Sequence, residues 1–185
     1  MPDYSDIVDS RTVRTELLLP AQIAQIWSYL TEPARLAAWL AQGQIDLREG
    51  GQVELTFDVE EVPERKKAGA MVRGVVNRCD PPRLLEYSWI DASAERARAE
   101  NPVPDSIVSF ELQSKDRETR LIVTHRRLPT AMVAGCAAGW HTHLANLRAR
   151  LNGEELKPFL PTWRKLMPTY EYRLANVLVT GQAED

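Results

Sequence analysis

The chain has 185 residues, with 26 acidic and 23 basic side chains that give a formal net charge of −3. Its length is that of one domain able to bury a core without disulfides. The slight negative charge provides no basic field, so we expect no nucleic-acid partner. No apolar run reaches the ~18 residues of a membrane span, and the acidic residues 1–10 do not resemble a signal peptide.

The two cysteines, Cys79 and Cys136, both lie in apolar segments. Two are too few for the disulfide framework of a small secreted domain. Thiols persist in reducing compartments. We therefore expect both cysteines to be reduced and the protein to be cytoplasmic.

The chain is predicted to open with a flexible tail over residues 1–10. A strand follows over 11–19, where Val13, Leu17 and Leu19 share one face. Pro20 and Pro33 then each open a short helix, over 20–31 and 33–40.

Six further strands are predicted in antiparallel succession. Residues 52–59 alternate most clearly, with Val53, Leu55 and Phe57 on one side and acidic or polar residues on the other. The charged stretches 60–67 and 91–105 are expected to be loops. The six strands span residues 45–47, 52–59, 68–79, 83–90, 106–113 and 119–128.

A long helix is predicted over residues 130–151, between the start signal Pro129 and the stop signal Gly153. Such a helix is ~33 Å long and crosses a whole small domain. After a run of strands it predicts an α+β fold in which the helix packs into a curved sheet. One stripe of the helix carries Val133, Cys136, Trp140, Leu144, Leu147 and Leu151.

Residues 154–185 form an extension beyond this helix. Pro158, Pro161 and Pro168 predict that its first half is broken. The extension is nevertheless too apolar for a disordered tail, as Phe159 and Trp163 show. We expect it to pack on the domain, residues 11–153, or on a second subunit in a homodimer.

The segment PAQIAQIWSYLTEPARLAAWL resembles the opening of the START-like (SRPBCC) superfamily, and most closely its branch of activator of Hsp ninety ATPase homologues. The resemblance covers about residues 11–153 and implies the helix-grip fold: a curved antiparallel sheet of about six to seven strands around a long C-terminal helix. Further matches, in order, are Arg48–Gly51, Gly74, Pro81–Leu84, Trp89, Thr119–Leu121, Thr124-His125 and Gly139-Trp140.

The resemblance also implies an apolar cavity between the sheet and the long helix. It predicts that the protein binds a small hydrophobic molecule such as a lipid. Two alternatives remain: a module that binds a chaperone or another protein, and a cyclase or hydrolase that pairs His125 with Glu86 or Tyr87. The residues predicted to line the cavity are Phe57, Met71, Tyr87, Trp89, Phe110, His125, Trp140 and His143.

The sequence predicts no catalytic residue, cofactor or metal. His141 and His143 are two apart on a helix and point in different directions. A set of His125, His143 and Cys136 resembles metal ligands, but its spacing is not that of a metal motif. Cys136 and His143 lie ~10 Å apart along the helix, too far for proton transfer. Phosphate-binding glycine motifs and the G-x-S-x-G elbow are absent from the sequence.

Overall fold

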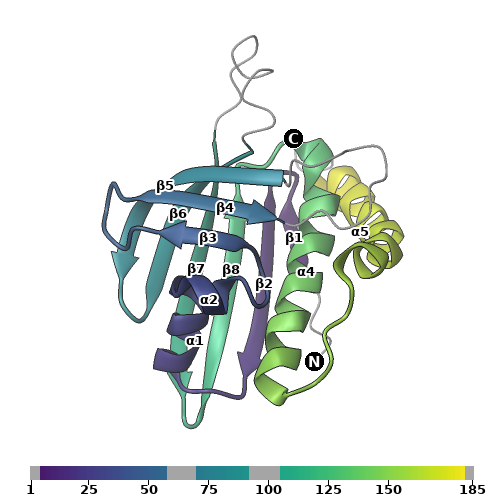
Figure 1. Cartoon of the computed structure of the whole chain (residues 1–185). Coiled ribbons are helices and arrows are strands. Elements are labelled where there is room, and N and C mark those ends of the chain that lie inside the picture. The colour runs from purple at the N-terminus through teal and green to yellow at the C-terminus, as the bar shows by residue number, and fades with distance from the viewer. Residues whose placement is uncertain (1–4, 58–69, 92–104, 182–185) are drawn as a thin grey trace.

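The computed structural model describes residues 5–57, 70–91 and 105–181 (Figure 1). The strands in this part of the chain are β1 (Asp6–Asp9), β2 (Thr12–Leu19), β3 (Gln42–Ile45), β4 (Gln52–Phe57), β5 (Ala70–Asp80), β6 (Leu84–Asp91), β7 (Ser106–Lys115) and β8 (Glu118–Arg126). The helices are α1 (Ile23–Thr31), α2 (Pro33–Leu36), α4 (Thr130–Asn152) and α5 (Phe159–Gly181).

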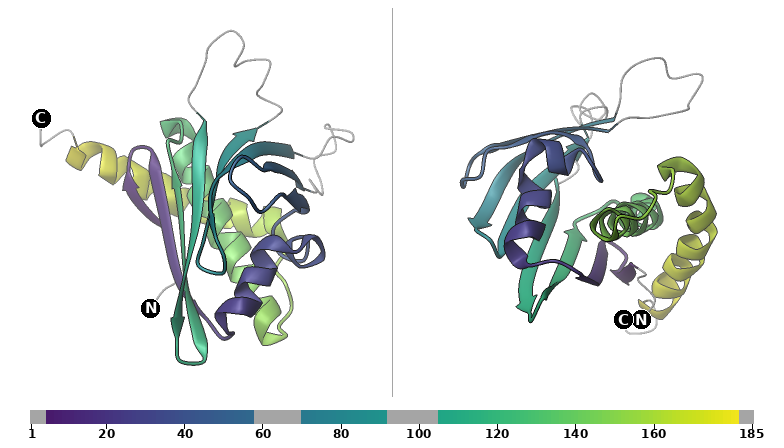
Figure 2. Two further views of the ribbon diagram at one scale, coloured as in Figure 1. Left: turned by 90° about the vertical axis from the view of Figure 1, so that its left-hand side faces the viewer. Right: turned by 60° about the horizontal axis from the view of Figure 1, so that its bottom comes forward.

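All eight strands join one antiparallel sheet in the order β1-β2-β8-β7-β6-β5-β4-β3. The sheet curves around α4, with α1 and α2 at one end (Figures 1 and 2). Helix α5 packs against α4 and β1 on the other side. This is the predicted helix-grip arrangement, with slightly more strands than expected.

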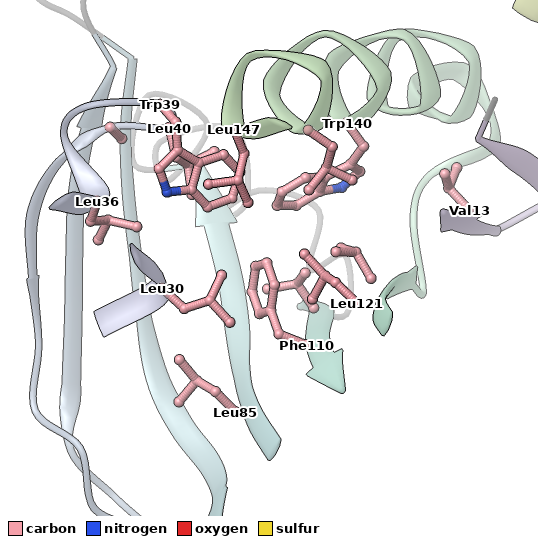
Figure 3. Close-up of a cluster of buried hydrophobic side chains, with 14 of the residues drawn as sticks. Val13, Leu30, Leu36, Trp39, Leu40, Leu85, Phe110, Leu121, Trp140 and Leu147 are labelled. Atoms are coloured by element: carbon pink, nitrogen blue, oxygen red, sulfur yellow. The ribbon is translucent and has the colours of Figure 1, made fainter. Parts of the chain in front are cut away.

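Strand alternation sends apolar residues toward α4, as predicted. On β2, Val13, Leu17 and Leu19 are buried. The predicted stripe of α4 is also buried at Trp140 and Leu147, and α4 ends where Gly153 adopts a left-handed conformation with φ 70°. Figure 3 shows the resulting core, in which side chains of α1, α2, the sheet and α4 converge.

The N-terminal segment differs from the predicted tail. Asp6–Asp9 forms β1, which pairs with β2 at the edge of the sheet. The pairing is reinforced by Ser5, whose hydroxyl accepts a hydrogen bond from Thr15 at 2.7 Å and whose backbone N–H donates to the Tyr170 hydroxyl at 3.0 Å. A four-residue strand that carries two aspartates has too weak a pattern to be seen in the sequence.

The C-terminal extension also differs from the expected broken segment, because residues 159–181 form one helix that continues through Pro168. Pro161 falls in the first turn, where a proline costs no helical hydrogen bond. Tertiary packing stabilises α5 beyond its first turn. Tyr170 is fully buried, and the Trp163 indole donates to the Gly135 carbonyl at 2.9 Å.

None of the helices in residues 5–57, 70–91 and 105–181 combines the length and the apolarity that crossing a membrane requires.

Candidate functional site

Seven of the eight predicted lining residues form one continuous ring cluster between α4 and the sheet. Trp89 is its centre, with ring centroids 5.7 Å from Phe57, 5.4 Å from His125 and 5.6 Å from Trp140. Phe110 lies 5.7 Å from Trp140 and 5.9 Å from Tyr87. The facing apolar surfaces that the sequence predicted are therefore brought together.

Met71 is the exception, because its side chain is 38% exposed on the other face of the sheet. Its neighbour Val72 is buried in its place, at 4% exposure. Two adjacent apolar residues on a strand leave the inward face ambiguous, and the sequence favoured the wrong one. Met71 therefore does not line the site.

The cluster has two layers. Its floor consists of Tyr87, Phe110, His125 and Trp140, which are all buried. Its rim consists of the half-buried Phe57, Trp89 and His143 together with Cys136 and Gly139, which are also half-buried on α4. The rim thus offers apolar surface that the described residues leave partly uncovered.

Gly139 lies on α4 between Cys136 and His143, at helical spacings of three and four residues. A Cβ atom placed on Gly139 would meet no described atom within 4 Å beyond its own stretch of helix. By contrast, a Cβ on Gly135 would touch the ring of Trp163 at 3.5 Å. The α4 side of the rim is therefore open at Gly139.

His143 joins the rim to the extension. Its ring lies 5.9 Å from Phe57 and stacks on Phe159 at 4.5 Å. Its Nδ1 is 3.1 Å from the Trp39 carbonyl, which can only accept, so Nδ1 carries the proton of the neutral ring. Phe159 was assigned to the extension by its sequence position, so its contact with the site was not predicted.

His125 is held in one tautomer by its neighbours. The Ser106 hydroxyl donates to the Trp89 carbonyl at 2.9 Å, so it accepts from His125 Nε2–H, also at 2.9 Å. His125 Nδ1 is then the acceptor for the Trp140 indole N–H at 3.2 Å. The thiol of Cys136 lies 3.2 Å from the same Nδ1 atom.

Sequence reasoning tested Cys136 against His143 on the same helix and rejected the pair. The structure instead brings Cys136 to His125, which is on the facing strand β8. No local spacing reports such a contact. The arrangement of Ser106, His125, Trp140 and Cys136 depends on how the helix is rotated against the sheet.

The titratable groups of the cluster are neutral near pH 7. Burial lowers the pKa of His125 to about 3. Burial also lowers the pKa of His143 to about 4, against a smaller opposing effect of its hydrogen bond to Trp39. Burial raises the pKa of the Cys136 thiol to about 12 and that of the Tyr87 hydroxyl well above its usual range. The cluster therefore provides hydrogen-bonding groups but neither a thiolate nor an imidazolium.

Of the two pairings considered for an enzyme, His125 with Glu86 or with Tyr87, the one with Glu86 is not formed. Glu86 points to the outer face of the sheet, because it alternates with the inward Leu85 and Tyr87. There its carboxylate accepts from Arg126 at 2.9 Å. Within the described residues no three histidine, cysteine or acidic side chains gather as metal ligands.

Two surface depressions lie outside the ring cluster. The first, of about 420 Å³, is lined mainly by charged and polar residues of the outer sheet face, including Arg78, Glu86 and Arg126. The second, of about 400 Å³, lies beside Ile23, Pro82 and Gln113. Neither borders the rim or the floor.

The family model described as Activator of Hsp90 ATPase homolog 1-like protein matches residues 20–152 of the chain. Among solved structures, a protein of Bordetella parapertussis is 32% identical with a TM-score of 0.71, covering 89% of this chain and 87% of that one. CalU16 from Micromonospora echinospora is 23% identical with a TM-score of 0.66, covering 88% of each chain. Among curated proteins, none matches the chain.

Proposed function

The chain belongs to the family of Activator of Hsp90 ATPase homolog 1-like proteins, and from this premise we propose that it binds a small, neutral, hydrophobic molecule at the rim of the ring cluster. The membership confirms the predicted likeness to START-like (SRPBCC) proteins and their helix-grip fold. Binding at the rim is our own inference from the residues described above.

The observation that carries the proposal is the open position at Gly139 in the half-buried rim. Phe57 and Trp89 are half-buried residues of the same rim, and a Cβ on Gly139 would meet no described atom within 4 Å beyond its own stretch of helix. Each Å² of apolar surface removed from water contributes ~25 cal/mol. A ligand of ordinary size would therefore bind in the micromolar range after its entropic cost.

The preference for a neutral ligand follows from the state of the histidines. A buried charge requires a partner of opposite charge. His125 and His143 are both neutral near pH 7, and the described rim and floor contain no arginine, lysine or carboxylate. We therefore expect uncharged aromatic and polyketide-like compounds to bind better than fatty-acid anions.

The test compares two variants of one glycine. Gly139→Phe places a ring in the open position, whereas Gly139→Ala adds one methyl group that meets no neighbour. A panel of aromatic compounds, polyketides and fatty acids is screened by thermal shift and by quenching of tryptophan fluorescence. We expect hits on the wild type and on Gly139→Ala and loss of binding in Gly139→Phe. A wild type that no compound shifts, with no quenching, would refute the proposal.

A second candidate function is protein interaction, with a chaperone or with a second copy of the chain. It is favoured by Tyr172 and Val179 on α5, which are 69% and 70% exposed. Sedimentation of the wild type and of a Tyr172→Glu, Val179→Glu double variant tests the homodimer. A homodimer formed through α5 should dissociate in the double variant, whereas a wild type that sediments as a monomer would exclude a homodimer.

We also propose that the protein is located in the cytoplasm. Cys79 and Cys136 are both free thiols in the structure, which suits a reducing compartment. Fractionation of cells that express the full chain checks this location.

A further inference from the structure

The Nδ1 atom of His125 is approached by two hydrogen-bond donors. The Trp140 indole N–H and the Cys136 thiol both lie 3.2 Å from it. An imidazole nitrogen without a proton offers one lone pair. Because Nε2–H is engaged with Ser106, the ring cannot turn over to offer its other nitrogen. One lone pair is therefore shared between two donors.

The two donors differ in strength and in exposure. An indole N–H is a full donor, whereas a thiol S–H is a weak one, so Trp140 takes the lone pair. The thiol of Cys136 is then left without a good acceptor. Cys136 is half-buried at the rim, whereas Trp140 is 4% exposed in the floor. The Cys136 S–H is thus a hydrogen-bond donor without a strong acceptor, at the point where the rim meets the floor.

We propose that the ligand of the rim carries a neutral carbonyl oxygen, of the ketone or aldehyde class, that binds at this point. The oxygen accepts from Trp140 N–H while the Cys136 S–H donates to His125 Nδ1 in its place. The ligand gains a complete hydrogen bond and the protein loses none. The exchange involves hydrogen bonds alone, and no covalent bond forms or breaks. This inference rests on the proposed binding function.

The geometry selects against the two obvious competitors. A pure hydrocarbon fills the rim but gains no hydrogen bond from Trp140. A carboxylate brings a charge toward His125, which stays neutral, and finds no cation among the described floor residues. A carbonyl oxygen accepts from Trp140 without bringing an unpaired charge, and the Cys136 S–H then gains His125 Nδ1 as its acceptor.

The experiment uses a matched ligand pair, 2-acetylnaphthalene and 2-isopropenylnaphthalene, which differ in C=O against C=CH2 at nearly the same planar shape. Their dissociation constants are measured by equilibrium dialysis against the full chain. The proteins are the wild type, Cys136→Ala, Cys136→Ser and, as a matched control, Cys79→Ala at the other free cysteine. The ratio of the two constants removes the difference in hydrophobicity between the compounds.

We expect Cys136→Ala to weaken ketone binding about threefold to tenfold relative to the hydrocarbon, the value of one net hydrogen bond. Without the thiol, His125 Nδ1 depends on Trp140 alone, so the ketone must break that bond to form its own. Cys136→Ser supplies an O–H donor and should restore the wild-type ratio, while Cys79→Ala should not change it.

Infrared spectroscopy of the bound ketone provides a second readout. Its carbonyl band should move to lower frequency in the wild type and in Cys136→Ser, and less in Cys136→Ala. A ratio and a band that are equal in the wild type and Cys136→Ala would overturn the inference while leaving hydrophobic binding intact. If neither compound binds the wild type, the proposed function fails, and the carbonyl site with it.

Discussion

The floor and the rim of the ring cluster both contain aromatic and histidine rings but differ in how far these rings are buried. In the floor, Trp140 and Phe110 are 4% and 2% exposed and meet edge to face. In the rim, Trp89 and Phe57 are half-buried and tilted against each other. The floor therefore contributes mainly to stability, whereas the rim, where we propose that a ligand binds, has apolar surface that the described residues leave partly uncovered.

The largest expected difference concerns the two tryptophans. Trp140→Ala should destabilise the protein by ~3–5 kcal/mol, because a fully buried ring is replaced by a cavity. Trp89→Ala should cost about half as much, since part of its ring is already in contact with water. Urea unfolding measures both. Equal losses would mean that the rim is as closed as the floor, and a loss below 1 kcal/mol in Trp140→Ala would mean that α4 does not grip the sheet.

The histidines extend the comparison to pH. The pKa of His125 in the folded protein is about 3 and that of His143 about 4, both below the ~6.5 of an unfolded histidine. The unfolded chain therefore takes up protons first, and stability is lost as the pH falls below ~6.5 toward those values. Between pH 7 and 5 these two residues should cost ~2–4 kcal/mol together.

Urea unfolding at pH 7 and pH 5 measures this loss in the wild type, His125→Gln and His143→Gln. Each variant should flatten the pH dependence by nearly the same amount, because the pKa values of both folded histidines, about 3 and about 4, lie below pH 5. An unchanged slope in His125→Gln would contradict the neutral, buried state of that ring.

Two neighbouring positions on α4 allow the difference between buried core and open rim to be tested by introducing a large side chain at each. Ala138 is fully buried, so Ala138→Phe should overpack the core and cost ~1–3 kcal/mol or more. Gly139→Phe adds an equally large ring one residue later, where a Cβ meets nothing, and should leave the unfolding midpoint nearly unchanged. If both variants lose the same stability, the space at Gly139 is not available.

The sequence predicted most of the sheet and the long helix because periodicity reports which face of each element is apolar. It placed Val13, Leu17 and Leu19 inward on β2 and Trp140 inward on α4, and all four are buried. It misjudged Met71, where two adjacent apolar residues make the alternation ambiguous. It also interpreted Pro168 as a breaker, although packing around the buried Tyr170 overrides that local preference.

The hydrogen bonds in the polar part of the site were beyond sequence reasoning for a different reason. His125 and Cys136 are 11 residues apart, on β8 and α4, and meet only through the rotation of one element on the other. Ser106 reaches His125 from β7 across the sheet. Periodicity assigns residues to faces, but it does not determine which polar atoms on facing elements come within hydrogen-bonding distance.

The smallest expected effect is a gain in stability at the rim. Gly139→Ala should stabilise the protein by ~0.5–1 kcal/mol, because alanine restricts the unfolded chain and is favoured within a helix, while its methyl group meets no described neighbour. Gly135→Ala is the matched control on the same helix. Its methyl group would touch Trp163 at 3.5 Å, an ordinary contact, so a similar gain is expected if Trp163 keeps its hydrogen bond to the Gly135 carbonyl.

Thermal and urea unfolding of the two alanine variants therefore compare helix propensity at a covered and an uncovered position. Gly139→Ala should also keep ligand binding, because one methyl group occupies little of the open space. If Gly139 serves binding rather than folding, Gly139→Ala should be more stable but should bind the ligand more weakly. That result would place the ligand directly against the α4 backbone, whereas unchanged binding would place it nearer to Phe57 and Trp89.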